Sequence, residues 1–303
     1  MIPAITSNKN LTPYDIEQLK KYDASIYYRP SFSVDDLIFT VSEQESENYR
    51  KLSDKSLRIL MVKRGEWPHK DLWALPGGFL KEGESIDQAA NNILRTKTNI
   101  KDIYMEQLYT WGDPARDFRT QVISCSYIAL VKGSTHELKA GDGIAEAAWF
   151  DIGFKVCRES KTALETGFAF EKDIELTLTH EDTVLSANIR ISEIREGRAS
   201  TISRATLEKT GIAFDHEIMI EYAIERLRNK IEFTDIAFNL MPEEFTLSHI
   251  QQVYEVILNR ELLAPAFRRK IAAMVTETKN FTSDAGHRPS KLYKFNSNWK
   301  GEQ

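Results

Sequence analysis

The segment Leu75–Ile100, LPGGFLKEGESIDQAANNILRTKTNI, constrains the fold of this 303-residue chain more than any other stretch. It begins with two adjacent glycines, passes through a Glu-Gly-Glu turn and ends in residues with helical periodicity. Glycines before a helix start let the backbone approach a ligand, and the helix start favours anions. One apolar stripe predicts that this helix packs against a sheet, and it is formed by Ile86, Ala89, Ala90, Ile93 and Leu94.

Short apolar runs around this segment predict β-strands at 35–41, 57–64, 121–131 and 147–152. Residues 42–56 have no apolar periodicity and predict a long loop. Strands interleaved with a helix favour an α/β or α+β sandwich over 32–152. Within 153–213, alternation over 173–191 predicts a β-hairpin in an insertion or linker, to which we assign no function.

Helical periodicity dominates from about residue 215. The runs 217–231 and 246–259 predict two amphipathic helices, the second with Thr246 as its N-cap. A third helix is expected over 264–275, with Pro265 in its first turn. Two strands, 274–281 and 291–296, follow it. Three helices and a two-stranded hairpin with a basic tip have the layout of a winged helix.

Charge is distributed unevenly along the chain. The net charge is −5, but residues 258–303 hold nine Lys/Arg against four Asp/Glu, while the rest hold 31 against 41. A basic end on an acidic body favours a second, nucleic-acid-binding function, with ordinary variation in surface charge as the alternative. Two cysteines cannot form a disulfide framework, and neither a signal peptide nor an apolar run of membrane-spanning length is present. We therefore expect a cytoplasmic protein without a membrane partner.

The segment at Gly78 and Glu84 resembles the signature of the Nudix family, G-x5-E-x7-R-E-U-x-E-E-x-G-U, where U is apolar. The flanking VKRGEWPHKDLWALPGGFLKEGES and GDGIAEAAWFDI are also similar to that family, which implies a Nudix fold over 32–152. The acids of the motif are missing. A hard cation such as Mg²⁺ needs carboxylate oxygens, so we expect no metal, no cofactor and no catalytic residue here. The motif Arg, its three later Glu and its late Gly are replaced by Asn92, Ile93, Thr96, Lys97 and Asn99.

Binding remains compatible with what the segment keeps. We expect Arg64, Gly77, Gly78 and Glu84 to contact a ligand. Arg95 and Lys97 are candidates to replace the positive charge of the metal. The alternatives are solvated side chains and a turn retained only for folding.

A second stretch, YTWGDPARDFRTQV (109–122), contains a turn and clustered charges before a strand. Its arginines match phosphate in fork geometry, whereas a surface loop with internal ion pairs is the alternative. The stretch resembles one in Nudix proteins that act on or sense ADP-ribose-like nucleotides, which implies ligand binding by Asp113, Arg116, Asp117 and Arg119. Trp67, Trp73 and Trp111 are candidates to stack on a base, and we expect at least two of them in the core.

The stretches MPEEFTLSHIQQVYEVILNRELLAPAFRRKI and GHRPSKLYKF resemble the winged helix of the Nudix-related transcriptional regulators, the NrtR family. The resemblance implies a nucleotide-sensing Nudix domain and dimers on palindromic operators. The second helix of a helix-turn-helix enters the major groove, while Phe267 and Ile271 would pack inward. A solvated basic face is the alternative. The expected DNA contacts are Arg268, Arg269 and Lys270 in the helix and His287, Arg288 and Lys291 at the wing.

We therefore expect an α+β chain with an N-terminal extension (1–31), a Nudix α/β/α sandwich with a mixed sheet (32–152), an insertion or linker (153–213) and a winged helix-turn-helix domain (214–303). The expected function is a ligand-responsive, DNA-binding transcriptional regulator that senses an ADP-ribose-like nucleotide or a sugar phosphate. It would act as a homodimer on palindromic double-stranded DNA. The alternatives are an active Nudix hydrolase using acids such as Glu82, Glu84 and Glu146, and a nucleotide-binding module whose C-terminal domain contacts protein.

Overall fold

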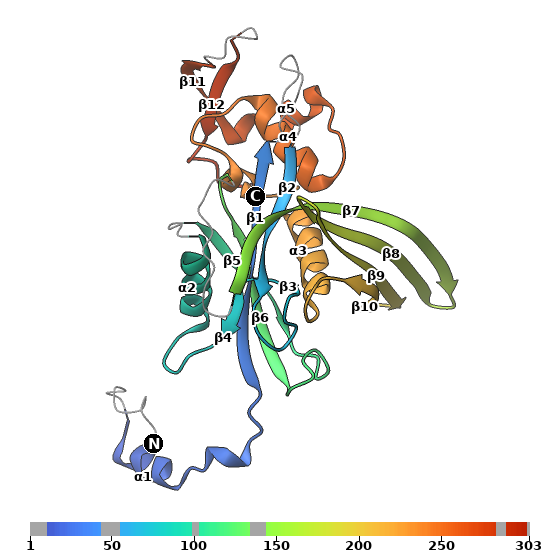
Figure 1. Ribbon diagram of the computed structural model, residues 1–303. Helices are drawn as coiled ribbons and strands as arrows, with labels where there is room; N and C mark the ends of the chain where they lie inside the picture. The colour runs from blue at the N-terminus through green and yellow to red at the C-terminus, as the bar shows by residue number, and fades with distance from the viewer. Residues whose placement is uncertain (1–10, 44–54, 99–102, 134–143, 283–288, 302–303) are drawn as a thin grey trace.

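A long mixed sheet forms the centre of the molecule (Figure 1). The computed structural model describes residues 11–43, 55–98, 103–133, 144–282 and 289–301. The strand order is β10-β9-β8-β7-β2-β1-β6-β5, with β3 paired to β2 and β4 to β1. Among the described strands, β1 and β6 run parallel and the other pairs are antiparallel. The strands of the central part are β1 (Ser31–Glu43), β2 (Lys55–Arg64), β3 (Trp73–Ala74), β4 (Gly77–Phe79), β5 (Tyr104–Trp111) and β6 (Val122–Leu130).

Helices cover both faces of this sheet. Alternate side chains of β1 point to opposite faces, as the pleat of a strand requires. Val34 packs with Ala89 and Ala90 of α2 (Ile86–Thr98) on one face. Leu37 and its alternate neighbours belong to the core that includes α3 (His216–Ile231) on the other face. The predicted α/β/α sandwich and the α+β class are therefore confirmed.

The sheet continues well beyond the end expected for the sandwich. β7 (Ile144–Leu164) crosses the predicted boundary at 152 and pairs with β8 (Gly167–His180) along its length. The hairpin expected over 173–191 corresponds to β8 and β9 (Thr183–Glu196), and β10 (Ala199–Thr210) forms the outer edge. These four strands make the curved arm on the right of Figure 1. The division into domains stays a prediction, because the sheet itself has no break at 152.

The C-terminal end contains the predicted helices and hairpin. Thr246 accepts a hydrogen bond from the His249 N–H and so begins α4. The third helix is shorter than the expected 264–275, since a 3-10 turn and then a strand replace its last residues. The elements are η3 (Ile236–Leu240), α4 (Leu247–Leu258), α5 (Ala264–Ile271), η4 (Ala272–Met274), β11 (Val275–Phe281) and β12 (Lys291–Phe295).

The central sheet and the C-terminal helices share one apolar core. Leu37 of the sheet, Ile220 and Leu227 of α3, Ile250 of α4 and Phe267 of α5 belong to the same buried cluster. α3 therefore connects the two parts by packing on both.

The described part of the N-terminal extension, from residue 11 to residue 30, adds no buried residue to this core. α1 (Pro13–Lys21) has a capping box between Thr12 and Asp15 and no buried residue, and a short η2 (Ala24–Ile26) leads from it to β1. Of the described helices, none has the length and apolar content needed to cross a bilayer. The described ends of the loop expected at 42–56 are strand instead, because Ser42 and Glu43 of β1 pair with Ser56 and Lys55 of β2. Residues 44–54 lie outside the described part of the chain.

Candidate functional site

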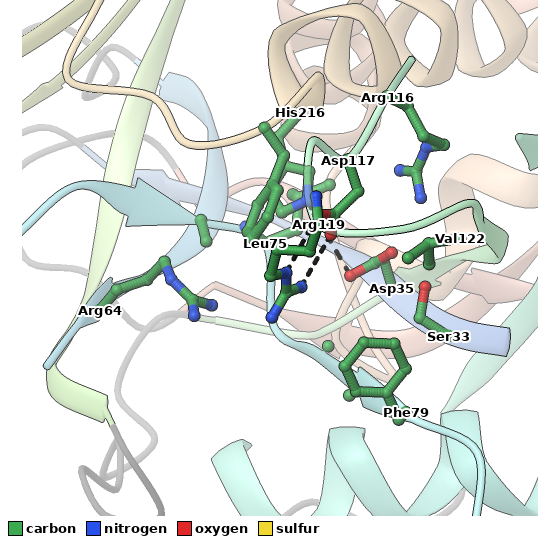
Figure 2. A pocket seen from close by; sticks show the side chains of 14 residues that line it. Ser33, Asp35, Arg64, Leu75, Phe79, Arg116, Asp117, Arg119, Val122 and His216 are labelled. Atoms are coloured by element: carbon green, nitrogen blue, oxygen red, sulfur yellow. Dashed lines mark hydrogen bonds and ion pairs between the residues drawn. The ribbon is translucent and has the colours of Figure 1, made fainter. Parts of the chain in front are cut away.

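A cavity of about 240 Å³ lies where β1, β4, the loop before β6 and the start of α3 meet (Figure 2). Half of its lining residues are polar or charged, and Leu75, Phe79 and Phe214 add apolar surface. Five separate segments of the sequence contribute to it, since Arg64 comes from the end of β2. Its lining residues are Ser33, Asp35, Arg64, Ala74, Leu75, Gly77, Gly78, Phe79, Arg116, Asp117, Arg119, Val122, Phe214 and His216.

The two glycines of the opening segment have different structural roles. β4 pairs with β1 so closely that a Cβ on Gly77 would lie 2.0 Å from Asp35 Oδ1 and 2.9 Å from the Val34 carbonyl oxygen. A Cβ on Gly78 would meet no atom within 4 Å. Gly77 is thus required for packing, while Gly78 leaves open space beside the cavity.

Asp35 and His216 are buried at the cavity, at opposite sides of a small gap. Asp35 Oδ2 accepts a hydrogen bond from the Ser124 hydroxyl, and burial raises the pKa of Asp35 to about 6. His216 Nδ1 accepts a hydrogen bond of 2.8 Å from the Leu75 N–H. Burial and neighbouring cations lower the pKa of His216 well below its usual value. The ring is therefore neutral and carries its proton on Nε2, which lies 4.0 Å from Asp35 Oδ1.

The arginines expected to bind a ligand in the 109–122 stretch already form ion pairs within the protein. Arg116 donates to both oxygens of Asp215 at 2.8 and 3.0 Å, and its side chain is 6% exposed. Arg119 pairs with Asp117 at 2.7 Å, which keeps the pKa of Asp117 below its usual value. The internal ion pairs that the sequence left as an alternative are thus present.

Arg119 nevertheless faces the cavity among aromatic rings. Its guanidinium lies 5.7 to 5.9 Å from the ring centroids of Phe79, Trp67 and Phe214. Arg64 lies 5.1 Å from the ring centroid of Phe214 and donates to the Pro68 carbonyl. Two guanidinium groups therefore border the same aromatic surface, where a planar or anionic ligand group would meet both charge and π-faces.

Two further cavities lie beside this one. A cavity of about 330 Å³ shares Arg64, Gly77 and Gly78 with the first and adds Glu84. Asp113 lines a third cavity together with Arg116 and Tyr222. The structure thus gathers the expected ligand residues around one region, except that Asp113 lies on the far side of the Arg116–Asp215 pair. Their role in binding stays a prediction.

Several cavity residues had no signal in the sequence. Ser33 and Asp35 belong to an apolar strand, and Phe214 and His216 precede or begin a helix that the sequence assigns to the C-terminal domain. Of the three tryptophans, Trp73 is in the core, Trp67 is 69% exposed and Trp111 is half-buried at the third cavity. The expectation that at least two would be in the core holds for Trp73 and in part for Trp111, which packs against the same core cluster, while Trp67 lines the second cavity.

The residues along α2 do not fit the divalent-cation site that a Nudix fold implies. Glu84 accepts hydrogen bonds from the Asn92 side chain at 2.7 Å and from the Lys81 N–H at 3.2 Å. Thr96 donates to the Asn92 carbonyl, and the acid of the helix, Asp87, accepts from the Tyr127 hydroxyl. In the described part of the chain, no three His, Cys, Asp or Glu side chains are grouped so as to hold a metal. Arg95 is exposed and lines none of the three cavities, and the Lys97 side chain lies outside the described residues.

The expected DNA-contacting residues also separate into groups. Arg268 and Arg269 are exposed on α5, while Phe267 and Ile271 are buried beneath them. Lys270 instead donates to Glu232 at 2.6 Å, and Lys291 pairs with Glu277 across the β11–β12 hairpin. His287 and Arg288 lie outside the described residues.

α3 joins the cavity to the C-terminal helices. Its N-cap is Asp215, the partner of Arg116, and its first residue is His216. Its C-cap is Glu232, which accepts from Lys270 of α5 and from Arg260 at 2.7 Å. At 1.5 Å per residue, its 16 residues span about 24 Å. One helix therefore lines the cavity with its first residue, His216, and contacts α5 through its C-cap.

Comparisons with known proteins agree with this two-part organisation. A model of the NUDIX domain matches residues 51–153, and a model of the NrtR DNA-binding winged helix domain matches 237–295. The "ADPR responsive transcriptional repressor NtrR" of Acinetobacter baylyi is 30% identical over 280 residues, covering 91% of this chain and 86% of that protein. The chain belongs to the NrtR family. As a member of the NrtR family, it is a ligand-responsive transcriptional regulator with a Nudix domain and a winged helix.

Two more relatives place the NrtR-family chain among known proteins. A crystal structure of Shewanella oneidensis NrtR complexed with a 27mer DNA is similar with a TM-score of 0.55 and 25% identity, covering 88% of this chain and 93% of that one. An ADP-ribose pyrophosphatase of Methanocaldococcus jannaschii is 35% identical over 134 residues, covering 44% of this chain and 68% of that enzyme. The winged-helix match begins after α3, so α3 lies between the two matched segments.

Proposed function

We propose that this NrtR-family chain is a repressor whose affinity for operator DNA changes when ADP-ribose, or a closely related nucleotide or sugar phosphate, binds in the cavity beside β4. The observation that carries the proposal is α3, whose first residue, His216, lines the cavity and whose C-cap, Glu232, pairs with Lys270 of α5. The description of the Acinetobacter baylyi relative as an ADPR responsive transcriptional repressor supports the choice of effector.

The charges around the cavity support binding of a diphosphate. Arg64 and Arg119 border it, and Gly78 leaves room for a ligand to approach the backbone. Glu84, Asp113 and Asp117 would then orient neighbouring groups rather than hold a metal. Arg116, which is paired with Asp215, would exchange that partner for phosphate when the ligand binds. Such an exchange frees the N-cap of α3.

On the DNA side, we propose that α5 enters the major groove with Arg268 and Arg269 near the bases. Lys291, with His287 and Arg288, would contact phosphates from the wing. Two copies of the chain would bind the two halves of a palindromic operator, since the symmetry of a dimer matches that of such a site. The same proposal places the protein in the cytoplasm, where its DNA lies.

Binding the cavity ligand is expected to change DNA affinity only if the ligand favours one arrangement of α3. Displacing Asp215 from Arg116 at one end alters the position of a helix whose other end holds Lys270. By linkage, DNA must then change the affinity for the ligand by the same factor.

The test is a titration of operator-like DNA from the neighbouring genome region with the full chain, with and without ADP-ribose, at low salt. We expect a change in Kd of about 5- to 150-fold, the range typical of allosteric coupling. Binding that is independent of sequence, or an affinity that ADP-ribose leaves unchanged, contradicts the proposal.

A second candidate is hydrolysis of ADP-ribose, favoured by the similarity to the Methanocaldococcus jannaschii pyrophosphatase over 134 residues. We propose that this activity is lost, because Asn92, Ile93 and Thr96 offer no carboxylate where a bridging cation needs one. Incubation of the chain with ADP-ribose and Mg²⁺ should release no AMP above the rate of a Glu84→Gln control. Steady AMP release that the control abolishes would establish the hydrolase instead.

A further inference from the structure

Asp35 and His216 present an unsatisfied acceptor and an unsatisfied donor to the same cavity. Within the described residues, Asp35 Oδ1 accepts no hydrogen bond, and it lies 4.0 Å from His216 Nε2. The His216 side chain is 4% exposed and that of Asp35 is 11% exposed. Both residues line the cavity, so a group bound there can pair with these two atoms where the protein does not.

The 4.0 Å between Asp35 Oδ1 and His216 Nε2 indicates which kind of group can lie between them. It is too long for a direct hydrogen bond, which needs about 2.7–3.2 Å. An oxygen placed about 2.8 Å from both atoms fits when they are about 4 to 4.5 Å apart, because the angle at that oxygen is then about 90 to 105°. The group that carries this oxygen must accept a hydrogen bond from His216 Nε2–H and donate one to the Asp35 carboxylate. A hydroxyl group does both, whereas a phosphate oxygen only accepts.

The surrounding contacts fix both partners in these roles. The Ser124 hydroxyl occupies Oδ2 of Asp35, and Gly77 packs against Oδ1 from one side. The Leu75 N–H occupies Nδ1 of His216, which leaves the proton on Nε2. Both side chains line the cavity that contains Arg64 and Arg119, so a hydroxyl here belongs to a ligand whose anionic part those arginines face.

We infer that Asp35 and His216 bind one sugar hydroxyl between them. This hydroxyl-binding pair would select a sugar-bearing diphosphate over diphosphate alone. The inference rests on the proposed function for the identity of the ligand and adds how the cavity distinguishes it from diphosphate alone. Because His216 is the first residue of α3, the sugar hydroxyl would join β1 to the helix that leads to α5.

The experiment compares two variants with a matched control in the full chain. Asp35→Asn replaces the charged acceptor and keeps an oxygen for Ser124. His216→Asn removes the Nε2–H and keeps an acceptor for the Leu75 N–H. Asp36→Asn is the control, since Asp36 is an equally buried carboxyl on the opposite face of the same strand and does not line the cavity. Thermal unfolding of each variant verifies that it is folded.

Calorimetric titration with ADP-ribose and with inorganic diphosphate gives the readout. We expect Asp35→Asn and His216→Asn to weaken ADP-ribose binding by about ten- to a hundredfold, the range for a hydrogen bond to a charged group, and to leave diphosphate binding unchanged. Asp36→Asn should change neither. Titration with ADP distinguishes the two sugars: a parallel loss for ADP assigns the pair to the adenosine ribose, and an unaffected ADP affinity assigns it to the terminal ribose.

Other outcomes overturn the inference. Unchanged ADP-ribose affinity in both variants would mean that an ordered water fills the gap. Equal losses for ADP-ribose and diphosphate would mean a general distortion of the cavity. These failures differ from failure of the proposed function, in which ADP-ribose binds and responds to the variants but leaves DNA affinity unchanged. A wild-type chain that does not bind ADP-ribose contradicts both.

Discussion

At the scale of single residues, two adjacent carboxyl groups on β1 are buried at a cost in stability. Asp35 and Asp36 are both buried, and burial raises the pKa of each, that of Asp35 to about 6 and that of Asp36 well above its usual value. Neither oxygen of Asp36 has a hydrogen-bond partner among the described residues. Burying an unpaired carboxylate is unfavourable, so these residues reduce the stability of the strand they occupy.

This cost predicts a pH-dependent gain in Asp35→Asn. The folded state holds the Asp35 proton up to a pKa of about 6, whereas an unperturbed Asp has a pKa of 3.8. The free energy of unfolding therefore falls as the pH rises from about 4 to about 6. Removing the titration should stabilise the variant at pH 7.5 by on the order of 3 kcal/mol, and the gain should vanish near pH 4. Urea unfolding at both pH values measures it. A variant that is equally or less stable at pH 7.5 would contradict the assigned burial.

Sequence reasoning found the residues of the cavity that lie within motifs and missed the others. Arg64, Gly77, Gly78, Arg116, Asp117 and Arg119 occur in two recognisable stretches and all line the cavity. Asp35 and His216 lie far apart in the chain, and neither belongs to a recognisable motif. Their proximity depends on the pairing of β1 with β4 and on the path of the chain into α3, neither of which has a local pattern.

At the scale of elements, α3 packs against two parts of the molecule, the sheet and the C-terminal helices. Its periodicity predicted the helix correctly but assigned it to the winged helix. In the structure it packs across the sheet, and the chain before it pairs with β3 through Trp73 and Ile212. Amphipathic spacing shows that a helix has an apolar face but not which surface covers that face. Of β7 to β10, the sequence predicted only the strand at 147–152, within β7, and the hairpin of β8 and β9.

The C-cap of α3 leads to a prediction about how ADP-ribose binding is coupled to DNA affinity. Glu232→Gln removes the charge that Lys270 and Arg260 share, and the Glu232 side chain is 30% exposed, so stability should change by less than about 1 kcal/mol. The ratio of DNA Kd values with and without ADP-ribose should nevertheless fall by about threefold or more, because α5 is no longer held to α3. Fluorescence anisotropy with labelled operator measures the ratio.

Glu277→Gln is a suitable control for this prediction. It removes an ion pair with Lys291 within the β11–β12 hairpin, away from α3. Its ratio should match that of the unaltered chain, even if its DNA affinity differs. A Glu232→Gln variant with an unchanged ratio would show that the signal reaches α5 by another route.

At the scale of the whole molecule, charge separates the body from the C-terminal end. Residues 258–303 carry a net charge of +5 in a chain whose total is −5. A basic surface that neutralises phosphates releases counterions, so DNA affinity falls steeply with salt. The acidic body would at the same time repel DNA and help to orient the winged helix toward it.

The structure predicts which basic residues set this salt dependence. Arg268→Ala and Arg269→Ala should each lower the slope of log K against log salt by up to about 0.9 in magnitude for each phosphate that the arginine neutralises. Lys270→Ala should change the slope less, because Lys270 is paired with Glu232. Titrations between about 50 and 200 mM salt provide the slopes. If Lys270→Ala gave the largest change in slope, the Lys270–Glu232 ion pair would have to break when DNA binds.

The central position of β1 has a practical consequence for dissecting the protein. The segment that matches the Nudix domain, 51–153, contains neither β1 nor the start of α3. A fragment cut at those limits would lack the strand between β2 and β6, and with it one wall of the cavity. A fragment intended for ligand screening should therefore begin before Ser31 and extend past Ile231. A shorter fragment would leave the edges of β2 and β6 unpaired and would aggregate.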